Sequence, residues 1–153
     1  MKKTSLTLFT ENRRARFDYE TLEKFTGGLV LTGSEVKSIR GGGAKLTGAH
    51  VAVMQGELWL IGCHVSKYQK DGSLEGYVPD RRRKVLVKKK ELQEIAGKSA
   101  TKGLTLAPFS LYPLGRQIKL SFGLVRGKKT HDKRDALKKR DLDRQIQRGD
   151  DER

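Results

Sequence analysis

The side chains of this sequence that could do chemistry are mainly cations, and they occur in clusters. Three arginines fall within residues 13–16, four cations follow one another at 81–84, and lysines and arginines recur at 128–134. Guanidinium and ammonium groups at this density bind phosphate oxygens, because each supplies several charged hydrogen-bond donors. We expect the run at 81–84 to lie on a surface that faces anions, since it has few acids beside it in the sequence.

Residue types that build catalytic or metal centres are sparse. His50, His64 and His131 show no metal-ligand spacing with the single cysteine, Cys63, and Ser34 does not lie in a Gly-x-Ser-x-Gly motif. We therefore expect no catalytic residue, no metal ion and no cofactor. A ribonuclease is the most serious enzymatic alternative, because a basic groove with one histidine could cleave RNA, but it would need a second acid or base beside that histidine.

The charge of the whole chain indicates a polyanionic partner. Its 33 lysines and arginines against 18 aspartates and glutamates give a formal charge of +15, and residues 1–126 alone hold 23 basic and 11 acidic residues. A cationic body predicts nucleic acid rather than a neutral domain with a basic tail. With no apolar run of about 18 residues and no secretory signal, we expect a cytoplasmic protein with no membrane partner.

Two helices are predicted from local signals. Thr32 and Glu35 form a capping box, so a short helix should begin there and stop at the glycines 41–43. A second short helix should span 88–96 and end at Gly97.

Strand patterns account for most of the remaining body. The pattern predicts a hairpin of residues 49–54 and 58–61 around Gln55-Gly56, and 118–125 alternate apolar and mostly exposed positions. The strand around Pro108 should lie at an edge or carry a bulge. Near the start, residues 17–25 favour a strand that ends in a turn at Gly27-Gly28.

These elements predict a mainly β fold, an oligonucleotide-binding-type barrel with two or three short helices, and a split sandwich is the alternative. We expect one domain over 1–126, with a flexible N-terminus at 1–11, and a basic C-terminal tail over 127–153. The tail has three aliphatic anchors larger than alanine, Leu137, Leu142 and Ile146, and these cannot nucleate a core. It should be disordered when free and could become helical against RNA.

The chain carries an ordered series of motifs: Asn-Arg-Arg-Ala-Arg at 12–16, Gly-Ser-Glu-Val-Lys-Ser-Ile-Arg at 33–40, Pro79 with Arg81, Arg83 and Lys84, Lys-Gly-Leu-Thr at 102–105 with Pro108, Gly-Leu-Val-Arg-Gly-Lys-Lys at 123–129 and His-Asp-Lys-Arg at 131–134. This series resembles the SsrA-binding protein family, the small partner of transfer-messenger RNA in bacteria. Each motif is weak alone, but their order and spacing together are specific.

The resemblance implies a barrel that clasps the tRNA-like domain of transfer-messenger RNA and delivers this RNA to stalled ribosomes for trans-translation. The tail would then occupy the decoding centre of the small subunit and the empty mRNA channel. A monomer is expected in free form. The rival interpretation is a generic ribosomal or translation-factor protein with the same kind of barrel.

The resemblance also suggests site residues. Those expected to face RNA are Asn12, Arg13, Lys37, Arg40, Leu86, Lys119, Lys128 and Lys129, and those expected in the decoding centre are His131, Asp132, Lys133 and Arg134. Glu35 could serve RNA binding or only its helix cap, and Leu86 could instead be a core residue.

Three positions depart from the family pattern. Phe17 stands where the family usually has histidine, and Thr26 stands where it commonly has a glutamate near the RNA. The family's Gly-Lys after the first helix appears here as Gly42-Gly43, with Lys45 two positions later. These departures affect individual contacts rather than the resemblance.

Overall fold

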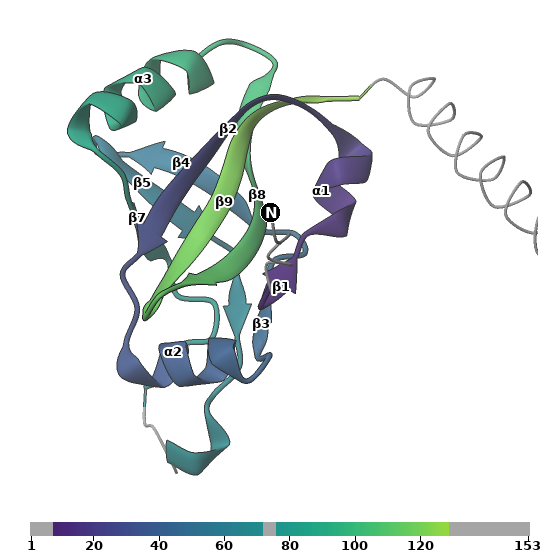
Figure 1. Ribbon diagram of the computed structural model, residues 1–153. Helices are drawn as coiled ribbons and strands as arrows, with labels where there is room; N and C mark the ends of the chain where they lie inside the picture. Colours follow the sequence, from purple (N-terminus) through teal and green to yellow (C-terminus); the bar gives the residue numbers. More distant parts are fainter. Residues whose placement is uncertain (1–7, 72–75, 129–153) are drawn as a thin grey trace, which may run out of the picture.

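The computed structural model describes residues 8–71 and 76–128, which form a mainly β domain with short helices (Figure 1). In chain order the elements are β1 (Thr10–Glu11), α1 (Arg13–Asp18), β2 (Tyr19–Leu29), α2 (Gly33–Arg40), β3 (Ala44–Lys45), β4 (His50–Met54), β5 (Glu57–Ile61), β6 (His64–Val65), the 3₁₀ helix η1 (Gln69–Asp71), β7 (Arg83–Leu86), α3 (Lys89–Ser99), β8 (Leu104–Leu114) and β9 (Gln117–Gly127).

The main sheet closes on itself. Its seven strands follow the order β1-β8-β4-β5-β7-β2-β9, and β9 also pairs with β8, so the sheet becomes a ring of antiparallel strands with β1 added beside β8. A second, small sheet pairs β3 with β6. The closed ring confirms the predicted oligonucleotide-binding-type barrel and excludes the split sandwich.

The predicted turn at Gly27-Gly28 is wrong, because β2 runs straight through both glycines. Phe25 and Gly27 face the interior, whereas Thr26 lies exposed on the outer face. A Cβ atom on Gly27 would lie 2.7 Å from Cγ1 of Val85, so glycine lets β7 approach closely here. The bulge predicted around Pro108 is present, since the pairing of β8 with β9 shifts register between Pro108 and Ser110.

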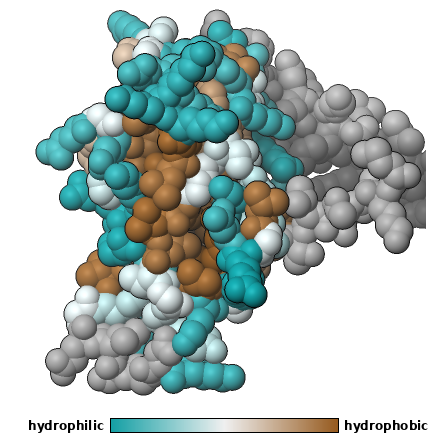
Figure 2. Space-filling model, turned by 60° about the vertical axis from the view of Figure 1, so that its left-hand side comes forward, coloured by the Kyte–Doolittle hydropathy of each residue, from teal (hydrophilic) through white to brown (hydrophobic). Residues whose placement is uncertain are grey.

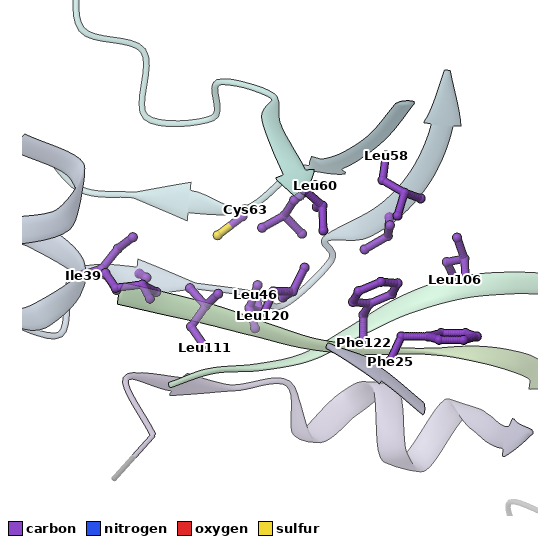
Figure 3. Packing of buried hydrophobic residues seen from close by; sticks show 14 of the residues in the cluster. Phe25, Ile39, Leu46, Leu58, Leu60, Cys63, Leu106, Leu111, Leu120 and Phe122 are labelled. Atoms are coloured by element: carbon purple, nitrogen blue, oxygen red, sulfur yellow. The ribbon is translucent and has the colours of Figure 1, made fainter. Parts of the chain in front are cut away.

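The barrel interior holds one large apolar cluster, part of which is drawn in Figure 3. Phe25 of β2 and Phe122 of β9 meet at its centre, with ring centroids 5.6 Å apart. Ile39 of α2 and Ile95 of α3 are both fully buried in this cluster. The two helices cap opposite ends of the barrel (Figure 1), so the core is closed at both ends.

The predicted capping box is confirmed. The Thr32 hydroxyl accepts from the Glu35 N–H, the Glu35 carboxylate accepts from the Thr32 N–H, and α2 ends at Gly41. The predicted end of the other helix at Gly97 is wrong, because α3 continues to Ser99. Just past α2, Gly42 adopts the positive φ that favours a glycine after a helix, whereas Gly97 does not adopt a positive φ.

Helix α1 was not predicted, and it covers part of the barrel's outer surface. Ala15 packs with Ala107, Phe109 and Val125 in a second, smaller cluster. Val125 is therefore buried, although the alternation of 118–125 placed it on the mostly exposed face. The Phe109 ring can lie over β9 because residue 123 is glycine, where a Cβ atom would lie 2.6 Å from that ring.

None of the helices in the described part of the chain combines the length and the apolar character that a membrane crossing requires.

Candidate RNA interface

The described residues that were predicted to face RNA lie in two groups. Asn12, Arg13 and Lys128 surround α1, whereas Lys37, Arg40, Leu86 and Lys119 lie on α2 and on the strands β7 and β9. Lys129 and the tail residues His131, Asp132, Lys133 and Arg134 lie outside the described residues.

Asn12 is a buried helix cap. Its side-chain oxygen accepts from the Ala15 N–H at 3.2 Å, its amide Nδ2 donates to the Pro108 carbonyl at 3.0 Å, and only 4% of the residue is exposed. These bonds hold the first turn of α1 against the bulge of β8. They give Asn12 a structural role, and its contact with RNA stays a prediction.

The cations around α1 differ in how firmly they are held. The side chain of Arg13 is 90% exposed and lies 4.0 Å from the Glu11 carboxylate, a distance that constrains it little. Arg16 pairs with Glu11 at 2.7 Å. The Lys128 ammonium donates to the Arg16 carbonyl at 3.2 Å, so the last described residue lies beside α1.

Helix α2 carries two of the predicted residues and connects them to neighbouring segments. The Lys37 ammonium lies 5.7 Å from the centroid of the Tyr68 ring. Arg40 lies over the Phe9 ring, and its guanidinium donates to the Arg116 carbonyl in the β8–β9 turn at 2.9 Å. This bond fixes Arg40 next to the start of β9, because Arg116 directly precedes that strand and lies three residues before Lys119. Tyr68 was not among the predicted residues.

Leu86 and Lys119 lie in one row across three strands. Gly28 of β2 pairs with Leu86 of β7 on one side and with Lys119 of β9 on the other. A Cβ atom on Gly28 would lie 3.7 Å from the Lys119 ammonium and 3.8 Å from Cβ of Leu86, so all three residues face outward. Across the sheet, an apolar side chain, the backbone of a glycine and a cation therefore lie next to one another. We call these three residues the Leu86–Gly28–Lys119 row.

Leu86 is not a core residue, since half of its surface (50%) is exposed. Figure 2 shows an apolar band on the side of the molecule where β7 lies in Figure 1, with hydrophilic surface next to it. An exposed leucine next to a cation suits contact with a ribose or a base, whose faces are apolar, while the cation meets a phosphate.

The expectation that the cations at 81–84 all face anions on the surface is wrong. Arg83 is fully buried and pairs with Glu35, which is 1% exposed, at 2.5 Å, and Arg81 donates to the other Glu35 oxygen at 2.5 Å. Lys84 pairs with Glu57 at 3.0 Å. The acids that pair with this run come from distant elements, Glu35 from α2 and Glu57 from β5.

The Arg83 guanidinium also satisfies three backbone carbonyls, those of Cys63, Pro79 and Arg81. Burial by itself would raise the pKa of Glu35. The hydrogen bonds from Arg81 and from the Thr32 N–H, together with the charge and hydrogen bond of Arg83, outweigh burial and lower this pKa below its usual value.

Of the histidines and the cysteine, the structure describes His50, His64 and Cys63. Burial raises the pKa of the Cys63 thiol to about 11, which keeps it protonated and unreactive at neutral pH. His64 lies 3.1 Å from the Asp80 carboxylate. Over residues 8–71 and 76–128, no group of three or more histidine, cysteine, aspartate or glutamate residues is arranged to hold a metal ion.

Two of the three departures from the family pattern involve exposed residues. Thr26 is exposed two positions before Gly28, and Lys45 is exposed on β3. Gly43 leaves no room for a side chain, because an added Cβ atom would overlap the Ser38 hydroxyl. A lysine at residue 43 would therefore require the end of α2 to move.

Comparisons with known proteins agree on one family. The SmpB protein family matches residues 9–151. The chain is 45% identical over 141 residues to the SsrA-binding protein of Gloeothece citriformis, which covers 92% of this chain and 91% of that protein. It is 43% identical to the SsrA-binding protein of Carboxydothermus hydrogenoformans, over 92% of this chain and 94% of that protein.

A solved structure gives the same result. A chain from the structure described as "tmRNA-SmpB: a journey to the center of the bacterial ribosome" superposes on this fold with a TM-score of 0.66. It is 45% identical in sequence, and the match covers 78% of this chain and 84% of that chain.

Proposed function

Because this chain belongs to the SmpB family, we propose that it binds transfer-messenger RNA and brings it to stalled ribosomes, where it acts in trans-translation. The observation that carries this proposal is the match of the family over residues 9–151, which includes the His-Asp-Lys-Arg motif at 131–134. The protein acts by binding, in the cytoplasm, and no step of this function requires a catalytic group.

We assign the tRNA-like domain of the RNA to the surface around α2, β7 and β9. Lys37 and Arg40 supply cations at the end of the barrel, and the Leu86–Gly28–Lys119 row extends this surface over three strands. Cations position the phosphates, and the apolar and bare backbone parts allow the ribose and base faces to come close. The surface therefore suits a folded RNA better than an arbitrary polyanion.

The tail is assigned to the ribosome. Its motif residues, His131, Asp132, Lys133 and Arg134, follow the last strand of the barrel after three intervening residues. An imidazole ring can stack on an exposed base, and the two cations can meet ribosomal phosphates. In this arrangement the barrel carries the RNA while the tail occupies the decoding centre and the empty mRNA channel.

Competition binding tests the proposal. The full chain is bound to the labelled tRNA-like domain of transfer-messenger RNA, and unlabelled competitors are added over a range of salt concentrations. We expect the tRNA-like domain to compete far better than a single-stranded RNA of equal length, because the proposed surface suits a folded RNA. Electrostatic contacts alone would not distinguish the two RNAs. Equal competition would contradict the proposal and favour a generic RNA-binding protein. Cleavage of the RNA without added metal would instead indicate a ribonuclease.

A further inference from the structure

Tyr68 differs from the other tyrosine on its loop because its hydroxyl does not fasten the loop to the barrel. Its ring belongs to neither hydrophobic cluster, and its hydroxyl makes no hydrogen bond within the described part of the chain. Tyr77, on the other side of the same loop, donates from its hydroxyl to the Val65 carbonyl at 2.6 Å. Tyr77 therefore fastens the loop to β6, whereas Tyr68 makes no such bond from its hydroxyl and its ring lies near the Lys37 ammonium.

The ring lines a cavity of about 270 Å³ between the end of α2 and the segment after β6. Its walls include Ser38, Gly41, Gly43 and Ser66. The Ser38 hydroxyl donates to the Ser66 carbonyl at 2.5 Å, and the Ser66 N–H donates to the Gly43 carbonyl at 2.8 Å. These bonds tie the two walls together, so the cavity is built into the fold near the end of the barrel that α2 covers (Figure 1).

One cation lies over the ring, and two more line the same cavity. The Lys37 ammonium lies 5.7 Å from the ring centroid, and Lys67 and Lys70, which also line the cavity, are exposed. An aromatic face next to a cavity, with cations around it, is the arrangement that binds an unpaired nucleotide, since the ring stacks on the base while the cations meet the phosphates. A phosphate backbone alone would need the lysines but neither the ring nor the cavity.

We propose that Tyr68 stacks on a single unpaired base of the bound RNA, with Lys67 and Lys70 at the flanking phosphates. This inference rests on the proposed function and deepens it. The barrel then recognises the RNA by a base that leaves its own stack as well as by the placement of phosphates. Because Lys37 belongs to α2 and reaches the same ring, the Tyr68 site is continuous with the surface assigned to the tRNA-like domain.

Binding of the full chain to the tRNA-like domain tests the stacking. Tyr68→Ala should weaken affinity by about tenfold to a hundredfold, as expected for the loss of one stacked base. The salt dependence of its affinity should stay unchanged, because no cation is lost, whereas Lys67→Ala should lower the salt slope by about one unit. Tyr68→Phe keeps the ring and should bind like the wild type.

Two further variants separate stacking from folding. Tyr77→Phe removes a tethered hydroxyl from the same loop and should keep its RNA affinity, even where its thermal unfolding temperature falls. Tyr68→Trp places a fluorophore in the site, and its added fluorescence, measured against the parent with its native Trp59, should be quenched when RNA binds.

The outcomes are distinguishable. Wild-type affinity in Tyr68→Ala, or equal weakness of Tyr68→Phe and Tyr68→Ala, would overturn the stacking while leaving the proposed function intact. A wild-type chain that fails to prefer the tRNA-like domain over single-stranded RNA would overturn both. An unquenched Tyr68→Trp variant that binds RNA normally would also contradict a base at this position.

Discussion

Glu35 and Arg83 form an ion pair from which water is excluded, although they lie 48 residues apart in the sequence. Arg81 reaches the second oxygen of the same carboxylate, and Arg83 uses its remaining donors on backbone carbonyls. The cluster connects the first turn of α2 with β7 and with the segment that precedes it. It therefore sets the position of the helix that carries Lys37 and Arg40.

Removal of Glu35 should destabilise the protein strongly. Glu35→Ala leaves the Arg83 guanidinium buried without its counterion, and such losses lower the free energy of unfolding by about 3–5 kcal/mol. Urea denaturation measures the difference. Glu57→Ala is the matched control, because the side chains of its pair with Lys84 are partly exposed (43% and 39%) and an exposed pair contributes about 0–1 kcal/mol. Similar losses in the two variants would contradict the role of the buried pair.

Stability should also fall in acid because of Glu35. Its pKa is lower in the folded state than in the unfolded state, so its contribution is complete above the usual carboxyl value of 4.5 and is lost as the pH falls below it. The free energy of unfolding of the wild type and of Glu35→Gln, measured by urea from pH 7 to pH 3, should converge below about pH 4.5. A constant difference over the whole range would assign the effect to another group.

The origin of this cluster shows where sequence reasoning succeeds and where it stops. The capping box of Thr32 and Glu35 was predicted correctly because both partners lie within one helical turn. The arginines at 81–83 were assigned to the surface, since nothing local shows that the fold returns them to Glu35. Long-range pairing of β2 with β7 decides which cations are buried, and the sequence pattern does not contain that pairing.

Alanine should lower the stability of the fold at residue 27 but not at residue 28. A methyl group at residue 27 would press on Val85 and the Leu86 carbonyl inside the sheet, so Gly27→Ala should destabilise the fold by about 1–3 kcal/mol. The methyl group of Gly28→Ala meets its neighbours at ordinary contact distance, so this variant should fold normally. The same methyl group would take up part of the space between Leu86 and Lys119 through which RNA is proposed to reach the backbone. Thermal unfolding and RNA affinity, measured on both variants, check this.

A control for the glycine pair lies at the other end of the barrel. Gly97→Ala makes the same chemical change on α3, where an added methyl group has open space, and it should be neutral or slightly stabilising. Its RNA affinity should equal that of the wild type. Unchanged affinity in both Gly28→Ala and the bulkier Gly28→Val would show that RNA does not approach the Leu86–Gly28–Lys119 row.

Lys119 should contribute one phosphate contact. Lys119→Ala should weaken binding of the tRNA-like domain and lower the slope of log affinity against log salt by about one unit, because one fewer counterion is released. Lys84→Ala provides the comparison, since Lys84 is paired with Glu57 in the free protein. A slope that is equally changed in the two variants would mean that the effect comes from net charge alone.

Truncation can separate binding of the tRNA-like domain from the action of the protein on stalled ribosomes. A chain that ends after Lys128 keeps the contacts of Lys128 with Asp18 and Arg16. It should retain most of its affinity for the tRNA-like domain and lose peptide tagging on stalled ribosomes, because the motif at 131–134 is gone. A gel-shift assay and a reconstituted translation assay measure the two properties. Loss of RNA affinity with the tail would contradict the division of roles.

The candidate site was predictable only in part, for a physical reason. Motif resemblance selected Lys37, Arg40, Leu86 and Lys119, yet nothing in the one-dimensional pattern indicated that Gly28 lies between two of them. Helix α1 was missed because six residues with mixed spacing, followed by a strand, give no clear helical period. Neither feature is local, since each depends on which segments the barrel places side by side.

The backbone N–H of Lys128 donates to the Asp18 carbonyl at 2.9 Å, where α1 gives way to β2. The segment that follows therefore starts from a fixed pivot on the rim of the barrel, not from a free end. If the terminal segment enters a ribosomal channel, as proposed, the point from which it leaves the barrel is set at the junction of α1 and β2, more than a hundred residues earlier in the sequence.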